Sequence, residues 1–468
     1  MGIAALIRQG EITPDEALDA TLEALPARDL DVHSVWTVFE ERARRAIRAG
    51  LPAGPLKGVP FVLKDLGIKL EGEVTTNGSK FFEGDVAPFT SELARRYEAA
   101  GLVIFGKVAT SEFGLGPSAD TDLFPRTNNP WDHSRVAGGS STGSAAAVAA
   151  RIVPAAHASD GGGSIRIPAA CCGTFGFKPS RGLNTYAPVA ESWSGMSVQH
   201  AITRSVRDSA LLLDCTAGAV PGDPYQCPLP NESFLSATQR DPKPMRIAMH
   251  LASVDGVRAE PEIVAAVEAM ASLLTDLGHE IIHEEPTFDM ADAARLYGII
   301  TSASVRMMIE DRAEALGREP REEDLLNVTR QIAANGNHHR AADLARAREA
   351  CFAAARQIAA YTERFDAVLC PTIAHLPPPH GTYDMRSTDM PSYMSAIFTF
   401  APFTAPASIA GQPAMNVPLG WSTSGLPIGV HFSSGYAQDS RLFSLAAQIE
   451  RARPWDDRRP GNPAERND

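Results

Sequence analysis

Short apolar runs alternate with amphipathic segments along most of this chain, and that alternation limits the fold more than any other feature. Val59–Leu63 is almost continuously apolar, as expected of a strand that is covered on both faces. Runs typical of strands also occur at 102–105, 245–249, 280–283, 366–372, 414–419 and 428–432. Between them, helical periodicity covers 13–25, 91–100, 205–215, 261–278, 290–310, 341–362 and 440–451. The alternation predicts an α/β fold in which helices cover both faces of a mixed central β-sheet.

Composition excludes several classes of partner. The chain has 43 basic and 56 acidic residues and a formal net charge of -13, which argues against binding to nucleic acid. Arg8, Glu11 and Asp15 interrupt the first apolar residues, and no later apolar run is long enough to cross a membrane. We therefore expect a cytoplasmic protein that has no membrane partner.

Cysteine and histidine spacing gives no sign of a metal centre. The six cysteines include no C-x-x-C pair, and no cluster of histidine, cysteine and aspartate has the spacing of metal ligands. We expect buried free thiols, no metal and no cofactor. His157 lies in an apolar run and is interpreted as a core residue.

Two glycine-serine clusters, Gly138–Ser144 and Asp160–Ser164, bracket an alanine-rich segment that we expect to be helical. Glycine in such numbers is typical of backbone that approaches another group closely or adopts positive φ. No Gly-Lys-[Ser/Thr] occurs, which excludes a phosphate-binding P-loop. Gly139–Gly143 fits the G-x-S-x-G pattern of α/β-hydrolases, but residues 128–135 before it are expected to form a loop and not the strand that this motif needs.

Each cluster taken alone is also compatible with a tight turn, in which Ser140, Ser141 or Thr142 caps the following helix. Lys64 makes that simpler interpretation less satisfactory. It is one of only seven lysines, and it ends the apolar run at 59–63. A lysine at that position either extends to solvent or is held in an apolar pocket.

Five segments together resemble the amidase signature family. Three of them are Gly58–Asp65, Gly138–Ala149 and Asp160–Ala169, and the two later ones are Cys172–Ser180 and Gly411–Ala414. The resemblance extends over nearly the whole chain. Within the family, the chain is most similar to bacterial aryl-acylamidases and to 6-aminohexanoate-cyclic-dimer hydrolases.

The resemblance implies a Ser–cisSer–Lys triad. By motif, Ser164 is the nucleophile, Ser140 is the bridging serine and Lys64 is the base. The peptide bond before Ser140 is expected to be cis. The backbone N–H groups of Gly161, Gly162, Gly163 and Ser164 fall where the family builds its oxyanion hole.

Three further residues are expected to support this site. They are Ser141 beside the bridging serine, and Asp160 and Arg166, which flank the nucleophile and are expected to form an ion pair. Gly161 departs from the pattern, because relatives often carry a larger residue there. Glycine at this position is expected to loosen the loop or widen the pocket.

Amide hydrolysis explains why these residue types are needed. A serine hydroxyl becomes a strong nucleophile only when a base removes its proton. Lysine can act as that base only when neutral, and burial without a counter-charge lowers its pKa. If the strand is extended here, Asp65 points away from Lys64 and does not hold it charged.

The resemblance implies a hydrolase that forms an acyl-enzyme on an amide C–N bond, without a cofactor. Two segments with aromatic residues and methionine, Tyr186–Met196 and Tyr393–Phe403, are expected to be pocket loops that suit aryl or apolar amides and oligoamides. The same triad serves a carbamate hydrolase (a urethanase) or an esterase, and an amidotransferase subunit working with a partner protein is the alternative of another class. The assembly that we consider for this chain is a homodimer.

The resemblance also implies a single amidase domain over residues 1–468. Residues 1–50 are expected to form an N-terminal helical segment, and residues 51–200 the catalytic core. Residues 201–468 supply the remainder of the sheet, the substrate-pocket loops and the covering helices.

Overall fold

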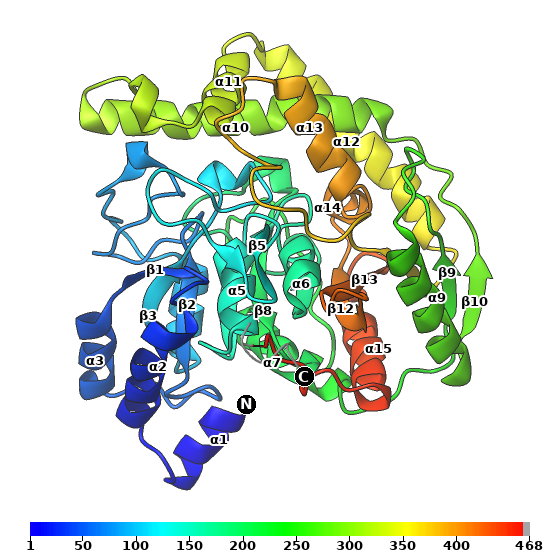
Figure 1. The fold of residues 1–468 in the computed structure, drawn as a ribbon, viewed down its shortest axis with the longest axis horizontal. Coiled ribbons are helices and arrows are strands. Elements are labelled where there is room, and N and C mark those ends of the chain that lie inside the picture. The colour runs from blue at the N-terminus through cyan, green and yellow to red at the C-terminus, as the bar shows by residue number, and fades with distance from the viewer. Residues whose placement is uncertain (462–468) are drawn as a thin grey trace.

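Eleven strands form one mixed β-sheet within residues 1–461, the part of the chain that the computed structural model describes (Figure 1). Their order across the sheet is β1-β3-β2-β6-β8-β7-β12-β13-β11-β9-β10. The strands are β1 (Val35–Val38), β2 (Pro60–Lys64), β3 (Val103–Val108), β6 (Ala155–Asp160), β7 (Phe175–Lys178), β8 (Val198–Thr203), β9 (Arg246–Met249), β10 (Glu280–His283), β11 (Ala367–Pro371), β12 (Ala414–Trp421) and β13 (Pro427–Ser433).

Strand direction changes several times across the sheet, which confirms the predicted mixed topology. β2 runs parallel to β3 and β6, and β9 runs parallel to β10 and β11. The remaining neighbours are antiparallel. The predicted strand at 59–63 is β2, which is buried at every position.

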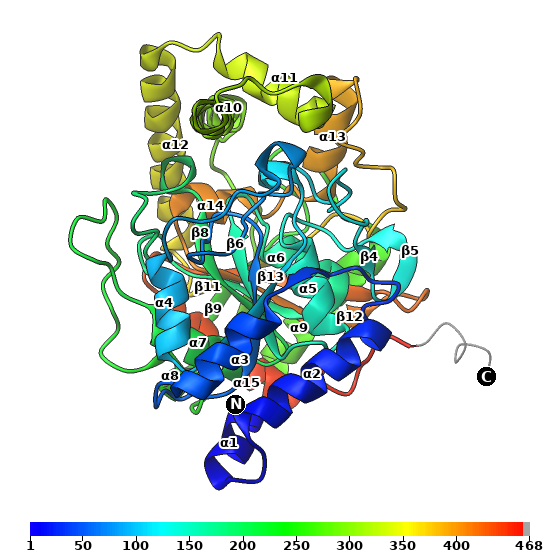
Figure 2. The same ribbon diagram turned by 90° about the vertical axis from the view of Figure 1, so that its left-hand side faces the viewer.

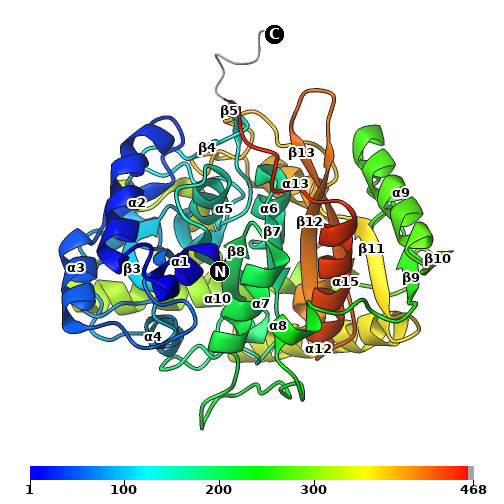
Figure 3. The same ribbon diagram turned by 90° about the horizontal axis from the view of Figure 1, so that it is seen from below.

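Helices cover both faces of the sheet, as the alternating pattern predicts. α2, α5 and α6 lie on one face, and α4, α7 and α15 lie on the other (Figure 3). Their bounds are α1 (Gly2–Gln9), α2 (Pro14–Arg28), α3 (Glu40–Ala49), α4 (Glu92–Ala99), α5 (Thr142–Ala149), α6 (Arg166–Cys172), α7 (Val206–Thr216), α8 (Phe234–Ala237), α9 (Pro261–Asp276), α10 (Ala291–Leu316), α11 (Asn327–Gly336), α12 (Ala341–Thr362), α13 (Met390–Phe400), α14 (Ala405–Ala410) and α15 (Asp439–Ala452).

Side chains of β2 alternate between the two layers. Val62 packs in the core that includes α2 and α5, whereas Phe61 and Leu63 pack in the core that includes α4 and α7. This alternation is the ordinary consequence of an extended strand covered on both sides. It leaves Lys64, the last residue of β2, fully buried at the carboxyl end of the strand.

Two local predictions are wrong in part. Residues 128–135 do not form a simple loop, because β4 (Asn128–Asn129) and β5 (Asp132–Val136) pair as a small antiparallel hairpin. The polar composition concealed this hairpin, which is separate from the main sheet and leaves no strand of that sheet running into Gly138. The N-terminal 50 residues are also not only helical, since they contribute the edge strand β1.

Helix α13 occupies a segment that was expected to be a loop. Its N-cap is Asp389, whose side chain accepts a hydrogen bond from the Ser392 N–H at 3.1 Å, and Pro391 stands in the first turn. These are ordinary helix-start signals. The pocket loop expected at Tyr393–Phe403 therefore lies for the most part within this helix.

Helices α10, α11, α12 and α13 lie together across one end of the molecule (Figures 1 and 2). A buried carboxylate attaches this layer to the core. Glu112, which follows β3, accepts hydrogen bonds from the Leu326 N–H at 3.0 Å and from Thr329 Oγ1 at 2.5 Å, both at the start of α11. Burial raises the pKa of Glu112 to about 7.

Candidate active site

Lys64 is held inside the protein and does not extend to solvent. Its side chain is 0% exposed, and its Nζ lies 2.7 Å from Ser140 Oγ and 3.0 Å from Ser159 Oγ. Of the two arrangements that the sequence left open for this lysine, the structure therefore shows the buried one. Its hydrogen-bond partners are neutral hydroxyl groups.

Burial lowers the pKa of Lys64 to about 7, although the nearby Asp160 carboxylate acts in the opposite direction. Asp65, the next residue, does not pair with Lys64. It accepts a hydrogen bond from the Thr76 N–H at 3.0 Å and lies 3.4 Å from Lys107 Nζ. Its orientation away from Lys64 agrees with the expectation for an extended strand, and Lys64 is left without a bound carboxylate.

Ser140 is placed beside Lys64 by a turn that requires glycine. Gly138 and Gly139 have φ of 78° and 58°, in the left-handed region that favours glycine. A Cβ at Gly138 would lie 2.5 Å from Cys171 Sγ, and one at Gly139 would lie 2.4 Å from Pro168 Cδ. The turn therefore lies too close to α6 for any larger residue.

The expected cis peptide bond before Ser140 is not found. Within residues 1–461 the structure contains one cis peptide bond, between Ala187 and Pro188. Ser140 therefore reaches Lys64 with a trans peptide bond before it.

Ser164 lies next to Ser140, at the end of the second cluster. The Ser140 N–H donates a hydrogen bond to Ser164 Oγ at 3.2 Å. Ser164 is half-buried, whereas Ser140 is only 3% exposed. The structure thus brings Lys64, Ser140 and Ser164 together in that order, and the hydrogen bond between the serines uses the backbone of Ser140 and not its hydroxyl.

The segment Gly161–Ser164 presents a row of free backbone donors. No hydrogen bond within the described part of the chain uses its four N–H groups. Two of its carbonyl groups are engaged by side chains, because Gly161 O accepts from Tyr297 Oη at 2.7 Å and Gly162 O accepts from Thr404 Oγ1 at 2.6 Å. Tyr297 and Thr404 thus hold the backbone of the segment through its carbonyl groups. Its N–H groups remain available to a ligand oxygen, because no group in the described part of the chain accepts from them.

Asp160 and Arg166 form the ion pair that the sequence predicted, and both side chains are 0% exposed. Arg166 Nε and one terminal nitrogen each donate to the carboxylate at 2.8 Å. Burial acts to raise the pKa of Asp160, but Arg166 outweighs it and lowers the pKa to about 2. Arg166 also donates to Thr404 O at 2.8 Å, which connects the pair to the segment before α14.

Ser141 supports the site, but it does not cap a helix. It precedes α5, but its side chain makes no capping hydrogen bond. Instead, Ser141 Oγ donates to Ser159 O at 3.2 Å and accepts from the Ser159 N–H at 3.3 Å. The contact joins the two glycine-serine clusters side by side.

The expectation that Gly161 widens the pocket is wrong. The Trp193 ring occupies the space that a side chain at position 161 would take. Trp193 belongs to the segment Tyr186–Met196, which was expected to line the pocket and has an irregular backbone apart from the 3₁₀ turn Trp193–Gly195. The second expected pocket loop, Tyr393–Phe403, is for the most part helix α13.

Sequence reasoning missed three residues that contact the site: Ser159, Tyr297 and Thr404. Ser159 directly precedes Asp160, so the second cluster could have been extended by one serine to include it. Tyr297 and Thr404 are more than 130 positions from the glycines that they contact, and no local pattern marks either of them.

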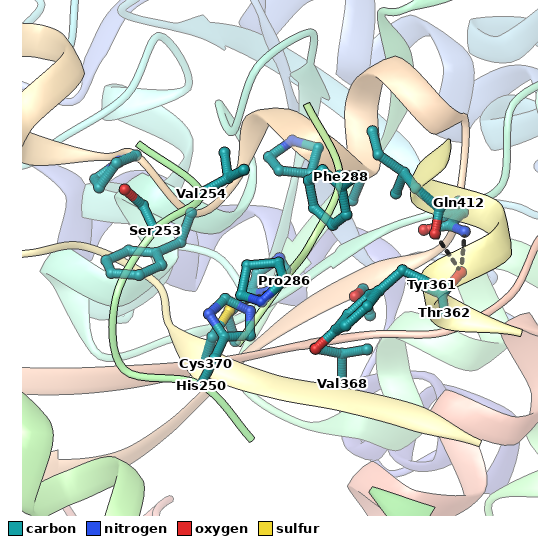
Figure 4. A pocket seen from close by; sticks show the side chains of 17 residues that line it. His250, Ser253, Val254, Pro286, Phe288, Tyr361, Thr362, Val368, Cys370 and Gln412 are labelled. Carbon is teal, nitrogen blue, oxygen red and sulfur yellow. Dashed lines mark hydrogen bonds between the residues drawn. The ribbon is translucent and has the colours of Figure 1, made fainter. Parts of the chain in front are cut away.

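A separate small cavity lies among β11, β13, α12, α14 and the segment after β9 (Figure 4). Its volume is about 30 Å³, which leaves room for one or two water molecules. Gln412 donates to Thr362 Oγ1 at 2.6 Å on its wall. Pro402 and Phe403, at the end of the second expected pocket loop, line this cavity, but Lys64, Ser140 and Ser164 do not.

Residues 1–461 contain no group of three His, Cys, Asp or Glu side chains arranged to hold a metal ion. Over the same range, no helix combines the length and apolar character needed to cross a membrane. All six cysteines are free, and five of them are buried.

The arrangement can support one kind of chemistry well. A buried, weakly basic lysine beside a serine hydroxyl can accept a proton, and a row of free N–H groups can stabilise a negatively charged oxygen. Together these are the requirements of a serine-dependent hydrolase of carbonyl compounds.

Known proteins similar to this chain agree with that class. Residues 16–443 match the family model described as Amidase. The 6-aminohexanoate-cyclic-dimer hydrolase of Paenarthrobacter ureafaciens is 34% identical over 475 residues, covering 98% of this chain and 95% of that protein. A solved structure of 6-aminohexanoate cyclic dimer hydrolase has a TM-score of 0.93 at 32% identity, over 98% of this chain and 97% of the other.

A solved bacterial aryl acylamidase of the amidase signature family is also similar, with a TM-score of 0.87 at 25% identity over 97% of this chain and 96% of the other. The chain therefore belongs to the amidase family. It is an amide hydrolase, an enzyme that acts on carbon–nitrogen bonds.

Proposed function

We propose that the chain hydrolyses small-molecule amides with Ser164 as nucleophile, Ser140 as proton relay and Lys64 as base. One observation carries the proposal: a fully buried lysine, whose pKa burial lowers to about 7, lies 2.7 Å from a serine hydroxyl, and that serine's N–H contacts Ser164 Oγ. At neutral pH a large share of such a lysine is unprotonated. It can therefore take the proton that serine must lose before it attacks.

The first half-reaction forms an acyl-enzyme. Ser164 Oγ attacks the amide carbonyl carbon as its proton passes to Ser140 Oγ and the Ser140 hydroxyl gives its own proton to Lys64. This step requires the Ser164 hydroxyl to turn toward Ser140 Oγ, because Ser164 Oγ otherwise accepts from the Ser140 N–H. The carbonyl oxygen becomes negatively charged and is stabilised by the N–H groups of Gly161–Ser164, where each donor is worth about a hundred- to a thousand-fold in rate. When the C–N bond breaks, a proton returns through Ser140 to the leaving nitrogen, which departs as an amine.

The second half-reaction frees the enzyme. Water attacks the ester carbonyl of acyl-Ser164 and gives one proton to the relay. The second tetrahedral intermediate collapses to a carboxylic acid, and Ser164 Oγ recovers its proton. No step in either half-reaction draws on a metal or another cofactor.

We assign the substrate class to linear or cyclic amides and oligoamides that carry an apolar or aryl group. Two arguments support this choice. The similar proteins include hydrolases named for a cyclic 6-aminohexanoate dimer and for aryl acylamides. Trp193 and Tyr297 also bring aromatic rings to Gly161, the first residue of the proposed oxyanion segment.

We further propose that residues 1–468 act as one catalytic domain. The described residues that build or support the site come from β2, the turn before α5, β6, the segment between β6 and α6, α6, α10 and the segment before α14. Together they span residues 64–404, so neither half of the chain supplies all of them.

A fluorophosphonate probe tests the nucleophile. We expect the purified chain to be labelled, and Ser164→Ala to lose both the labelling and the hydrolysis of anilides. Ser209→Ala is the control, because Ser209 is a buried serine of helix α7 that pairs with His200 of β8, away from the proposed site. Labelling of Ser164→Ala at the wild-type rate would show that another residue is the nucleophile.

A substrate panel tests the reaction class. It compares aryl amides, linear and cyclic oligoamides, aryl carbamates and aryl esters. We expect the amides to be hydrolysed by the chain alone. A preference for carbamates or esters above all amides would reassign the enzyme to those bonds. Glutamine hydrolysis that appears only with a partner protein would reassign it to an amidotransferase subunit.

A further inference from the structure

The turn that carries Trp193 is held in an unusual conformation. Trp193 and Ser194 both have φ of 53°, a region that bulky residues rarely adopt. Two groups clamp the turn: Arg181 Nε donates to Gly195 O, and the Gly195 N–H donates to Glu191, each at 2.6 Å. Backbone strain of this kind is maintained only where the surroundings enforce it, and it concentrates at functional sites.

The clamped turn seats the Trp193 ring directly on Gly161. A Cβ built at Gly161 would lie 2.7 Å from Trp193 Cε3 and 2.8 Å from Cζ3, closer than carbon atoms can approach. Glycine is thus the residue at position 161 that lets the indole stay where it is. The Trp193 ring therefore lies against Gly161, the first of the four residues whose N–H groups are free.

Tyr297 completes the arrangement from helix α10. Its ring meets that of Trp193 edge to face, with centroids 5.9 Å apart and planes at 85°. Its hydroxyl donates to Gly161 O at 2.7 Å. Edge-to-face contact is a favoured geometry for aromatic pairs. The two rings and Gly161 therefore hold one another in place.

Open space lies beside Gly162, the second residue of the proposed oxyanion segment. Apart from its chain neighbours, a Cβ built at Gly162 would have one heavy atom within 4 Å, Tyr297 Oη at 4.0 Å. Ser164 is half-buried, and so are Trp193 and Tyr297. For an amide whose carbonyl oxygen reached the free N–H groups, this space would lie beside the Tyr297 hydroxyl, with the Trp193 ring against the preceding residue, Gly161.

We propose that Trp193 determines specificity, by forming with Tyr297 an aromatic wall for the apolar group attached to the reacting amide. This inference rests on the proposed role of Ser164. The absence of a side chain at Gly161 is the condition for the wall, because it lets the indole lie against the oxyanion segment. Trp193 is also a positioning residue, since it holds Gly161 through van der Waals contact.

Selectivity measurements test the wall. The values of kcat/KM are compared for acetamide, hexanamide and acetanilide, so that an apolar group is added first on the acyl side and then on the amine side. Trp193→Leu should lower kcat/KM for hexanamide or acetanilide by about 10- to 100-fold, the usual scale for loss of an apolar pocket contact. Acetamide should change by no more than about threefold, since it makes little contact with the ring.

A size exchange tests the fit between Trp193 and Gly161. Gly161→Ala alone should lower kcat for all three amides, because the methyl group displaces either the indole or the oxyanion segment. Adding Trp193→Leu to Gly161→Ala should restore at least tenfold in kcat, because the smaller side chain makes room. Thermal melting of each variant separates a local effect from unfolding, and Trp193→Leu alone tests the wall if Gly161→Ala does not fold.

Trp421→Leu is the matched control. Trp421 is also half-buried, but it packs on Trp131 with ring centroids 4.5 Å apart, at the end of β12. The control should leave all three values of kcat/KM within about twofold of wild type. Equal losses for small and large amides in Trp193→Leu, or no rescue in the double variant, would overturn the inference. Wild-type activity in Ser164→Ala would instead overturn the proposed function.

Discussion

Replacing Lys64 by methionine should abolish hydrolysis and at the same time stabilise the folded chain. Methionine has a similar volume, so the packing is kept. Burial lowers the pKa of the lysine from 10.5 to about 7. Each pKa unit corresponds to about 1.4 kcal/mol, so the folded state disfavours the charged form by roughly 5 kcal/mol. Two hydrogen bonds to Ser140 and Ser159 are lost, at about 1 kcal/mol each, which leaves a net gain of about 3 kcal/mol.

The stability gained by Lys64→Met should decrease as the pH rises. The unfolded chain keeps Lys64 protonated up to about pH 10.4, whereas the folded chain releases that proton above about pH 7. The unfolded state binds more protons within this window, so wild-type stability rises as the pH increases from 7 to 10. The advantage of Lys64→Met should be largest at pH 7 or below and should shrink toward pH 10.

Two assays measure the prediction. Urea unfolding at pH 7 and pH 9, followed by tryptophan fluorescence, gives the stability of both chains. The pH profile of kcat/KM for the wild type should rise from acid to neutral pH with an apparent pKa of about 7, because only neutral Lys64 accepts a proton. A profile that stays flat down to pH 5, or a Lys64→Met chain that is less stable than wild type at pH 7, would refute this reasoning.

Three further substitutions test other parts of the structure. Asp160→Asn leaves the buried Arg166 without its partner and should lower stability by about 3–5 kcal/mol, measured as the urea midpoint; an unchanged midpoint would contradict a tightly coupled pair. Burial raises the pKa of Glu112 from 4.5 to about 7, so the folded chain holds this proton more tightly and stability falls as the pH rises through that window. Glu112→Gln should therefore have little effect at pH 4 and stabilise by roughly 3 kcal/mol at pH 8, and equal effects at both pH values would be inconsistent with a buried titrating carboxylate. Thr404→Val removes the hydroxyl that holds Gly162 O and should lower kcat/KM about tenfold. A variant that a fluorophosphonate labels at the wild-type rate would contradict this role of Thr404.

Elements with strong local signals were predictable from the sequence. The capping box at Thr13 begins α2, and Pro261 begins α9 at the expected residue. The predicted strand at 280–283 coincides with β10. The β4–β5 hairpin and the helix beginning at Met390 were missed, because polar or proline-rich composition hid short-range signals that the structure uses.

The candidate site was predictable where its residues lie in motifs. Lys64, Ser140 and Ser164 are brought together as the motifs imply, although the expected cis peptide bond is not found. Tyr297 and Thr404 could not be predicted, because each acts on the glycine segment from an element that is far away in the chain.

The sequence by itself determined the alternation of strands and helices, and the position of the two glycine-serine clusters along the chain. Both depend on short-range chemistry, namely hydrophobic periodicity and the backbone freedom of glycine. Only the tertiary structure decided that Lys64 is buried beside Ser140 with its pKa lowered, and that Trp193 lies on Gly161. Desolvation and close packing depend on which distant segments surround a group, and those neighbours exist only once the sheet and its covering helices have assembled.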